Sequence, residues 1–333
     1  MTSGAEDQVL RLADGRALGF RVWGNASGRP LLFLHGTPGS RLKFALGHEA
    51  GRALGLAIVA PDRWGYGLSE PHPSPSLAAF AGDMAALMDY LGHRRFAVGG
   101  ISGGGPYAAA VAALLSPRIS ALALISPMGP IADGECRRSL SRFHRASFAT
   151  LSRWPAATAA VFGLFRLSLR HSPRLAGRLA TLRAGAKDKA LIARPDIADR
   201  LLGSFREGLR PGMAGPVTDV RIFACPWGID LSAIRAPARL WIGTEDTAVP
   251  LAAARLLARS ISGCALTELP GEGHFWVAAH YGEVLEWVAA MLQPEAAQAM
   301  ADAGTQTAQA SACAETVSRA ICRARRVPRD QRR

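Results

Sequence analysis

The sequence predicts an α/β fold, with a mostly parallel, doubly wound sheet and an inserted helical cap. Three observations predict this fold class. Short, continuously apolar segments alternate with amphipathic helical segments, which is typical of strands buried on both faces of a parallel sheet. The alternation stops between about Met128 and Ser232 and then resumes. The 333 residues are 49% hydrophobic and 20% charged, with 35 glycines, which excludes a disordered or collagen-like chain and allows a sizeable core.

The individual elements follow from local patterns. Residues 9–12 and 18–23 flank the turn Asp14-Gly15 and predict a hairpin. Apolar segments predict parallel strands at 31–34, 56–60, 96–98, 121–125, 239–242 and 264–269. Apolar residues at helical spacing predict helices that include 80–91, 107–115 and 284–292. Strands that alternate with helices imply right-handed crossovers and place ligands at the carboxyl ends of the strands.

The chain divides into three predicted parts. Residues 6–127 and 233–293 form the α/β core. Residues 128–232 form the helical cap, because they hold arginine-rich helical segments separated by prolines. Residues 294–333 are rich in Ala, Gln, Thr and Ser, end in arginines and lack a periodic apolar face. We therefore expect a mostly disordered, arginine-rich tail there.

The formal net charge of +13, with a pI near 10.6, is unevenly distributed. Residues 128–235 carry +10 and residues 319–333 carry +6, whereas residues 1–127 sum to +3 and residues 236–318 to −6. No nucleic-acid-binding motif accompanies the basic segments, so we expect solvated basic surfaces and no nucleic-acid partner. A basic cap that rests on an anionic membrane surface is the alternative interpretation.

Five cysteines are scattered along the chain, at Cys136, Cys225, Cys264, Cys313 and Cys322. They lack the short paired spacings of zinc sites and disulfide frameworks, so we expect free thiols in a reducing, cytoplasmic compartment and neither a metal nor another cofactor. Residues 1–9 contain no apolar signal segment. The weakly polar stretch 97–116 contains several glycines and Pro106, so we expect no membrane span. The sequence makes no prediction of oligomeric state.

One serine stands in the strongest local motif of the chain. Gly100-Ile101-Ser102-Gly103-Gly104 directly follows the strand expected at 96–98 and precedes the helix expected at 107–115. This is the G-x-S-x-G pattern of a nucleophile elbow, in the context that the motif requires. Such a sharp turn strains the serine backbone and needs small flanking residues. We therefore expect Ser102 to be a nucleophile, with the Gly103 amide pointing where an oxyanion forms.

A serine hydroxyl needs a base to remove its proton and an acid to orient that base. Glu245 and Asp246 follow the strand expected at 239–242, and His274 follows the strand expected at 264–269. Both loops come at carboxyl ends of strands, on the same sheet edge as Ser102. His274 is thus the expected base, and the local pattern allows either acid as its partner.

The chain resembles the α/β-hydrolase superfamily over roughly residues 6–293. Four segments carry the resemblance in the superfamily's order: His35-Gly36-Thr37-Pro38-Gly39, Asp62-Arg63-Trp64-Gly65-Tyr66-Gly67-Leu68-Ser69, the Ser102 elbow, and the segments of Asp246 and His274. The resemblance implies Asp246 rather than Glu245 as the acid of the triad, and Thr37 as the source of a second oxyanion amide beside Gly103. It also implies that His35 orders its loop and that residues 128–232 form a lid.

We expect substrate contacts at Trp64, Met128 and Phe275. Trp64 departs from the proline that many relatives have after the arginine, and this change can alter the pocket wall. Other large apolar residues of the insertion are expected in the pocket wall or in the core of the cap: Phe143, Trp154, Phe162, Phe165 and Trp227.

The resemblance implies a serine hydrolase that cleaves a carboxylic ester, or a related acyl bond, of a small to medium apolar substrate through an acyl-enzyme. Alternatives within the same fold are a proline-releasing aminopeptidase, a thioesterase and a cofactor-free haloperoxidase. The His-Gly-Thr-Pro-Gly segment differs from the His-Gly-Gly-Pro-Gly of the proline-releasing peptidases, which disfavours that activity. The alternative outside the enzymes is a non-catalytic small-molecule receptor that keeps the triad.

Overall fold

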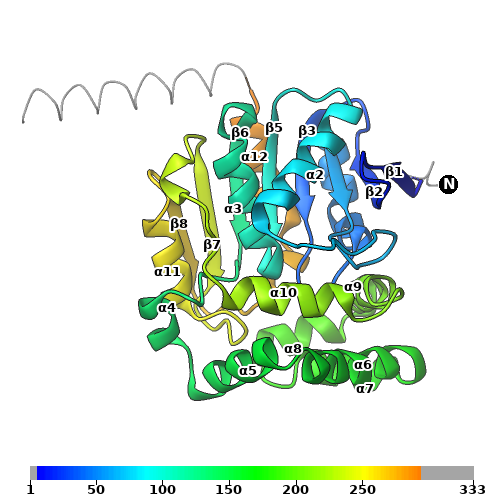
Figure 1. Ribbon diagram of the computed structural model, residues 1–333, viewed down its shortest axis with the longest axis vertical. Coiled ribbons are helices and arrows are strands. Elements are labelled where there is room, and N and C mark those ends of the chain that lie inside the picture. The colour runs from blue at the N-terminus through cyan, green and yellow to red at the C-terminus, as the bar shows by residue number, and fades with distance from the viewer. Residues whose placement is uncertain (1–5, 294–333) are drawn as a thin grey trace, which may run out of the picture. The chain divides into compact units, whose positions relative to one another are not determined.

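The computed structural model describes residues 6–293, in which one eight-stranded sheet has the order β1-β2-β4-β3-β5-β6-β7-β8 (Figure 1). The strands are β1 Gln8–Arg11, β2 Ala17–Gly24, β3 Arg29–Leu34, β4 Leu56–Pro61, β5 Phe96–Ile101, β6 Ile119–Ile125, β7 Ala238–Gly243 and β8 Ala265–Leu269. β1 pairs with β2, and β2 with β4, in antiparallel fashion, whereas β3 to β8 pair in parallel. The predicted α/β class, with a mostly parallel sheet, is confirmed.

Burial on both faces explains why the sequences of the central strands are continuously apolar. Every residue of β4 and of β5 is buried, because helices cover both faces of the sheet there. β1, by contrast, is mostly exposed and forms one edge of the sheet. β5 lies between β3 and β6, so its carboxyl end stands in the middle of the sheet edge.

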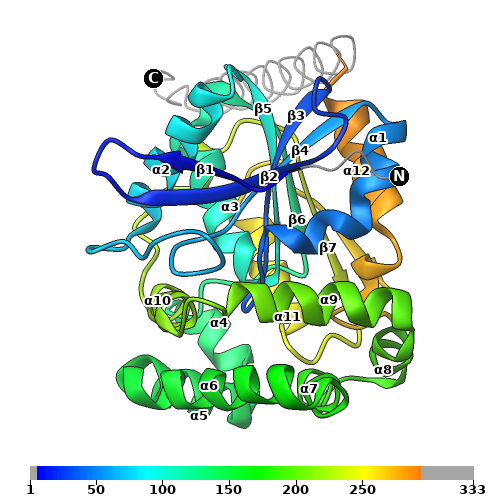
Figure 2. The same ribbon diagram turned by 90° about the vertical axis from the view of Figure 1, so that its right-hand side faces the viewer.

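Helices pack on both faces of the sheet (Figures 1 and 2). On one face lie α2 Leu77–Tyr90, α3 Gly105–Leu114 and α11 Leu251–Arg259, which bury Phe80, Val111 and Leu257 in a shared cluster. On the other face lie α1 His48–Ala53 and α12 Tyr281–Met291, where Leu285 packs with Phe33. Short 3-10 helices occur at Arg41–Gly47, Ser102–Gly104, Ser116–Arg118, Leu231–Ala233 and Trp276–Ala278.

In the described part of the chain, seven α-helices lie between β6 and β7. They are α4 Gly134–Ser139, α5 Arg142–Arg153, α6 Pro155–His171, α7 Pro173–Ala180, α8 Ala186–Ala193, α9 Pro195–Gly208 and α10 Ala214–Ala224. The helices α6, α7 and α9 each begin with a proline. Proline is tolerated at the first position of a helix because the N–H group that it lacks would have no acceptor within the helix. Figures 1 and 2 show two layers: α9 and α10 lie next to the sheet, and α5, α6 and α7 lie beyond them. We call these seven helices the cap.

α9 contacts the loops of the sheet closely. The N–H of Ser40 donates to Oγ of Ser204 at 3.0 Å, and the N–H of Gly67 donates to the carbonyl oxygen of Gly208 at 3.1 Å. A Cβ atom at Gly208 would overlap the carbonyl group of Gly39. The cap is therefore joined to the sheet loops by backbone as well as side-chain contacts.

Within residues 6–293, no helix is long and apolar enough to cross a membrane. The tail predicted over 294–333 lies outside the described residues, as do Cys313 and Cys322.

The two glycines of α9 are predicted to respond oppositely to alanine. Gly203→Ala places its Cβ where no atom lies within 4 Å. Alanine restricts the unfolded chain, so we expect the free energy of unfolding to rise by about 0.5–1 kcal/mol. Gly208→Ala forces a methyl group into the Gly39 carbonyl, and we expect a loss of about 1–3 kcal/mol. Urea unfolding followed by circular dichroism measures both, and equal stability of the two variants would contradict the close contact of α9.

Candidate active site

Ser102 lies on the sharp turn between β5 and α3. Its φ angle is 54°, in the left-handed region that residues with a side chain rarely adopt. A Cβ atom at Gly100 would overlap the backbone of Gly104, and one at Gly104 would overlap the carbonyl group of Leu34. Only glycine therefore fits at these two positions. The turn presents the Ser102 hydroxyl at the carboxyl edge of the sheet.

Three side chains form a hydrogen-bonded chain at this edge. Oγ of Ser102 lies 3.0 Å from Nε2 of His274, and Nδ1 of His274 lies 2.8 Å from Oδ2 of Asp246. An Nδ1–H that donates to the carboxylate leaves Nε2 free to accept from the serine hydroxyl. Asp246 follows β7 and His274 follows β8. The acid in contact with His274 is thus Asp246, while its neighbour Glu245 is exposed.

Backbone N–H groups fix the orientation of Asp246. Its Oδ1 accepts from the N–H groups of Ala248 and Val249, each at 2.8 Å. The side chain of Asp246 is fully buried and that of His274 is 13% exposed. The carboxylate consequently turns its second oxygen, Oδ2, toward the imidazole.

A carboxylate from the cap holds the loop of His274. Asp188 on α8 is buried, and it accepts from the N–H of His274 at 2.8 Å and from the N–H of Phe275 at 2.9 Å. A Cβ atom at Gly273 would overlap this carboxylate, so only glycine fits before His274. The cap thereby fixes the backbone that carries the imidazole.

The loop after β3 places Thr37 beside the elbow. A Cβ atom at Gly103 would overlap Oγ1 of Thr37, which shows how closely the two residues approach. Arg63 holds this loop, because its Nε donates to the carbonyl oxygen of His35 and its Nη2 to that of Gly36, both at 3.0 Å. Nε2 of His35 accepts from the N–H of Arg63 at 3.0 Å. His35 therefore orders its own loop.

A second cap carboxylate completes the arrangement. Asp219 on α10 is buried and forms an ion pair with Arg63. It also accepts hydroxyl hydrogen bonds from Thr37 at 2.5 Å, from Tyr66 at 2.7 Å and from Tyr107 at 2.7 Å. Tyr107 belongs to α3, the helix that follows Ser102. One cap side chain therefore links the Thr37 loop, Arg63 and the helix of the elbow.

Burial sets the protonation of this cluster. Burial alone would lower the pKa of Arg63, but the Asp219 carboxylate raises it above its ordinary value. Burial, with Asp219 adding to the effect, raises the pKa of Tyr66 and Tyr107 well above 10, so both remain neutral donors. Burial and the Arg63 charge lower the pKa of His35 well below 6.5, so His35 is a neutral acceptor.

Two of the three residues expected to contact substrate lie beside the hydrogen-bonded chain. The N–H of Met128 donates to the carbonyl oxygen of Ser102 at 2.9 Å. The ring of Phe275 lies edge-on to the imidazole of His274, with 5.4 Å between the ring centroids. Both side chains are half-buried.

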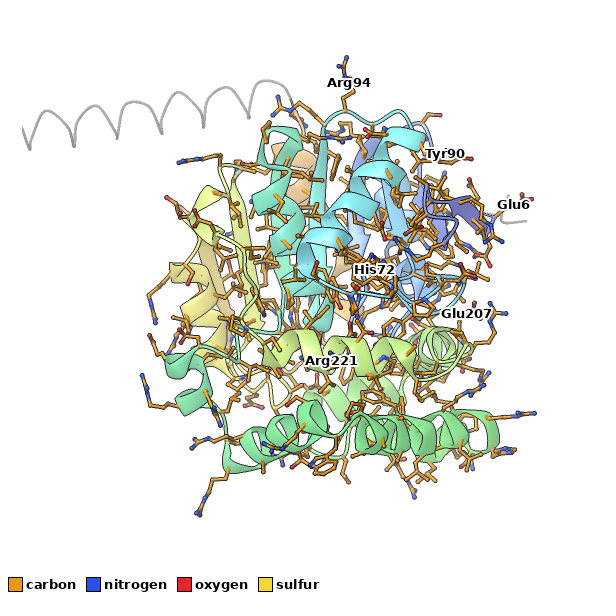
Figure 3. All side chains as sticks on the ribbon, viewed as in Figure 1. Glu6, His72, Tyr90, Arg94, Glu207 and Arg221 are labelled. Carbon is orange, nitrogen blue, oxygen red and sulfur yellow. The ribbon has the colours of Figure 1, made fainter. Side chains whose placement is uncertain are left out.

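Trp64 does not fit the predicted pocket wall. It is 3% exposed, its indole N–H donates to Asp83 at 2.7 Å, and its ring packs on Phe80 and on His72, which Figure 3 labels. A buried indole is stable where its N–H finds such a partner. These partners belong to α2 and its neighbouring loop, so Trp64 is a core residue.

The other large apolar residues of the insertion have mixed surroundings. Phe162 and Phe165 pack in the cluster of Leu202 and Phe205 on α9, which makes them part of the cap core. Trp227 packs against the main core. Trp154 is 61% exposed and is therefore not part of the buried core. The side chain of Phe143 lies outside the described part of the structure.

Sequence reasoning missed the two cap carboxylates, although a signal was present. Asp219 stands on the buried face of α10 with Val220 and Phe223, and Asp188 stands one turn before the buried Ile192 on α8. An acid at a buried helical position requires partners, since a buried charge is costly without them. Among residues 6–293, no group of three or more His, Cys, Asp or Glu side chains is arranged to hold a metal ion.

Comparison with known proteins identifies the family of the chain. The family model of the alpha/beta hydrolase fold matches residues 29–279. The chain belongs to the α/β-hydrolase family. A curated relative of this α/β-hydrolase, a non-heme chloroperoxidase from Streptomyces lividans, is 30% identical over 131 residues, which are 37% of this chain and 45% of the relative. The chain thus matches less than half of the length of the curated relatives.

Solved structures of other proteins share the fold of this α/β-hydrolase. A thermophilic esterase from Thermogutta terrifontis has a TM-score of 0.62 and 21% identity, covering 87% of this chain and 100% of that one. Epoxide hydrolase A from Mycobacterium thermoresistibile has a TM-score of 0.64 and 20% identity, covering 87% and 99%. At these identities the similarity concerns the fold.

We predict that His35 makes the stability of this α/β-hydrolase fall below pH 6.5. The unfolded chain takes up a proton at His35 near pH 6.5, whereas the folded chain does not, so the free energy of unfolding decreases as the pH falls. The expected contribution is about 1 kcal/mol between pH 6.5 and 5.5, and none well above pH 6.5. His35→Gln keeps an acceptor for the Arg63 N–H and does not titrate. Urea unfolding at several pH values should show a flatter dependence for this variant, and identical slopes would contradict the prediction.

Removal of the Asp219 charge is predicted to destabilise the fold. Asp219→Asn leaves the buried Arg63 guanidinium without its counter-charge, and we expect a loss of about 3–5 kcal/mol in the free energy of unfolding. Asp199 lies exposed on the neighbouring cap helix α9. Asp199→Asn should therefore change stability by less than about 0.5 kcal/mol. Urea unfolding compares the two variants, and a small loss in both would show that Asp219 is not required.

Proposed function

We propose that this chain is a serine hydrolase that cleaves a carboxylic ester, or a related acyl bond, through an acyl-enzyme. The observation that carries the proposal is the hydrogen-bonded chain from Ser102 through His274 to Asp246 at the carboxyl edge of the sheet. A nucleophile, a base and an orienting acid in this order are what a serine hydroxyl needs to become reactive. Membership of the α/β-hydrolase family supports the proposal of a hydrolase.

In the proposed reaction, Oγ of Ser102 attacks the carbonyl carbon while Nε2 of His274 takes the hydroxyl proton. Asp246 stabilises the imidazolium, and we assign the N–H groups of Thr37 and Gly103 to the oxyanion. Collapse of the tetrahedral intermediate breaks the ester C–O bond, and the alcohol leaves with the proton from His274. Water then attacks the acyl-enzyme with His274 as the base, which releases the carboxylic acid and restores Ser102.

Apolar side chains near Ser102 support an apolar acyl or alcohol group of small to medium size. Met128 and Phe275 flank the hydrogen-bonded chain, and Phe223 lies against Gly103. A charged substrate group would lose its hydration among such residues without compensation. A thioester suits the same surroundings, so a thioesterase falls within the proposal.

The surroundings disfavour a proline-releasing aminopeptidase. Such an enzyme needs an acid for the ammonium group of its substrate. The two buried cap carboxylates, Asp188 and Asp219, already accept hydrogen bonds from the protein itself. We therefore rank peptidase activity below ester hydrolysis.

A second candidate activity comes from the curated relatives, a non-heme chloroperoxidase and a non-heme haloperoxidase. If hydrogen peroxide rather than water attacks the acyl-enzyme, His274 takes the peroxide proton and the acyl group leaves as a peracid. The peracid then oxidises a halide in solution and returns to the carboxylic acid. Hydrogen peroxide and bromide added to the ester assay test this route, because they should yield oxidised bromide only with active Ser102.

We predict that the protein hydrolyses p-nitrophenyl esters, and that a panel of increasing acyl length defines its preference. Ser102→Ala and Asp246→Asn should each lower kcat/KM by about 1000-fold or more. Glu245→Gln is the matched control for the acid, and it should retain the activity of the unmodified protein because Glu245 is exposed.

Covalent labelling separates an enzyme from a receptor of the same fold. A fluorophosphonate probe should label Ser102 in the unmodified protein and should not label the Ser102→Ala variant. A folded protein that neither reacts with the probe nor hydrolyses any ester would favour a non-catalytic small-molecule receptor. Full activity in Ser102→Ala would refute the assigned nucleophile.

A further inference from the structure

The outer layer of the cap has an unusual charge composition. Between Cys136 and Lys187 the sequence contains ten arginines, one lysine and no acidic residue. All eleven cationic residues are exposed. This segment includes α5, α6 and α7, the layer farthest from the sheet in Figures 1 and 2. We call residues 142–183, which comprise these helices and the turn after α7, the outer cap surface.

The outer cap surface also exposes many large apolar side chains. Among the side chains that the structure describes, ten large apolar ones are exposed, and seven of them lie between Trp154 and Leu182. Leu182 is 71% exposed, Leu164 is 68% exposed and Trp154 is 61% exposed. The inward side of α6 is already filled by residues that pack on α9. A concentration of exposed apolar groups on one side of a fold indicates an interaction site.

Cationic and apolar residues share one face on α7. Arg174 and Arg178 are one turn apart, as are Leu175 and Leu179, and all four are exposed, while small residues form the buried side of the helix. Figure 3 shows side chains projecting outward from this layer, many of them with nitrogen at their ends. Arginines next to leucines and a tryptophan are typical of helices that lie in a membrane interface.

We propose that the outer cap surface docks on an anionic lipid bilayer. Its arginines attract anionic headgroups, while its leucines and Trp154 enter the boundary between headgroups and acyl chains. A second copy of the chain is a poorer partner, because two outer cap surfaces would oppose eight arginines with eight and supply no acid between them. A nucleic acid would pair with the arginines but would leave the aliphatic side chains against phosphates. Charge and apolar content together favour lipid.

Vesicle flotation of the full-length chain tests the proposal. We expect binding to vesicles of equal parts phosphatidylcholine and phosphatidylglycerol, no binding to pure phosphatidylcholine vesicles, and weaker binding as ionic strength rises. Arg174→Gln combined with Arg178→Gln should lower the partition coefficient about 25-fold, since each arginine near an anionic surface contributes a factor of about five.

Two matched control variants each remove two arginines from elsewhere in the chain. One replaces Arg94 and Arg95 by Gln, on the loop that Figure 3 shows at the end of the sheet away from the cap. The other replaces Arg325 and Arg326 by Gln, in the arginine-rich C-terminal segment. Both should bind vesicles like the unmodified chain. Equal losses in these controls and in the α7 variant would overturn the assignment to the cap.

The apolar part of the proposal has its own variant. Leu182→Ser should weaken binding even at low ionic strength, whereas Leu114→Ser, at the end of α3 away from Ser102, should not. Equal binding to neutral and anionic vesicles, binding to neither, or self-association through this surface would overturn the proposal. Hydrolysis of a soluble ester should be the same in all these variants as in the unmodified chain, so failure of docking is distinguishable from failure of the proposed activity.

Discussion

The buried ion pair between Arg63 and Asp219 is the interaction on which the arrangement around Ser102 depends. Moving two charges out of water costs several kcal/mol per ion, so a pair of this kind is stable only if its remaining donors and acceptors are also satisfied. Here the guanidinium donates to the carbonyl oxygens of His35 and Gly36, and the carboxylate accepts from two tyrosines. These partners belong to the sheet loops, to α3 and to the cap. The position of the Thr37 loop is therefore defined only when the cap is packed on the sheet.

The cap uses a second buried carboxylate on the other side of the site. Asp188 accepts from the backbone of His274 and Phe275, whereas Asp219 acts through Arg63 on the loop after β3. Each carboxylate holds a loop in place, while the sheet supplies the elbow of Ser102. An opening motion of the whole cap would break both sets of bonds at once, leaving buried groups without partners. A displacement confined to the outer layer, α5 to α7, would break neither set of bonds.

The sequence predicts the sheet and the elbow because local sterics and burial produce both. Strands covered on two faces leave continuous apolar segments, and a turn as sharp as that of Ser102 needs glycine at position 100. The local pattern left Glu245 and Asp246 equivalent, since neighbouring residues of a loop differ only in orientation. Trp64 was predicted in the pocket wall and instead lies in the core, because its N–H finds a partner on α2. The cap carboxylates were not predicted, since their partners are distant in sequence and no local pattern records them.

The positive net charge of +13 comes partly from the cap, whose two layers differ in their acidic residues. Helices α10 and α8 place acids where they meet a buried guanidinium and backbone N–H groups, respectively. The outer segment contains no acid at all, although a protein that only needs solubility is best served by interspersed charges of both signs. Like charges on one surface repel each other and weaken the fold. The leucines exposed among those arginines keep 42–71% of their surface in solvent, so folding buries only part of their apolar area. A surface that combines charge repulsion with exposed leucines is best explained by a partner that is both anionic and apolar.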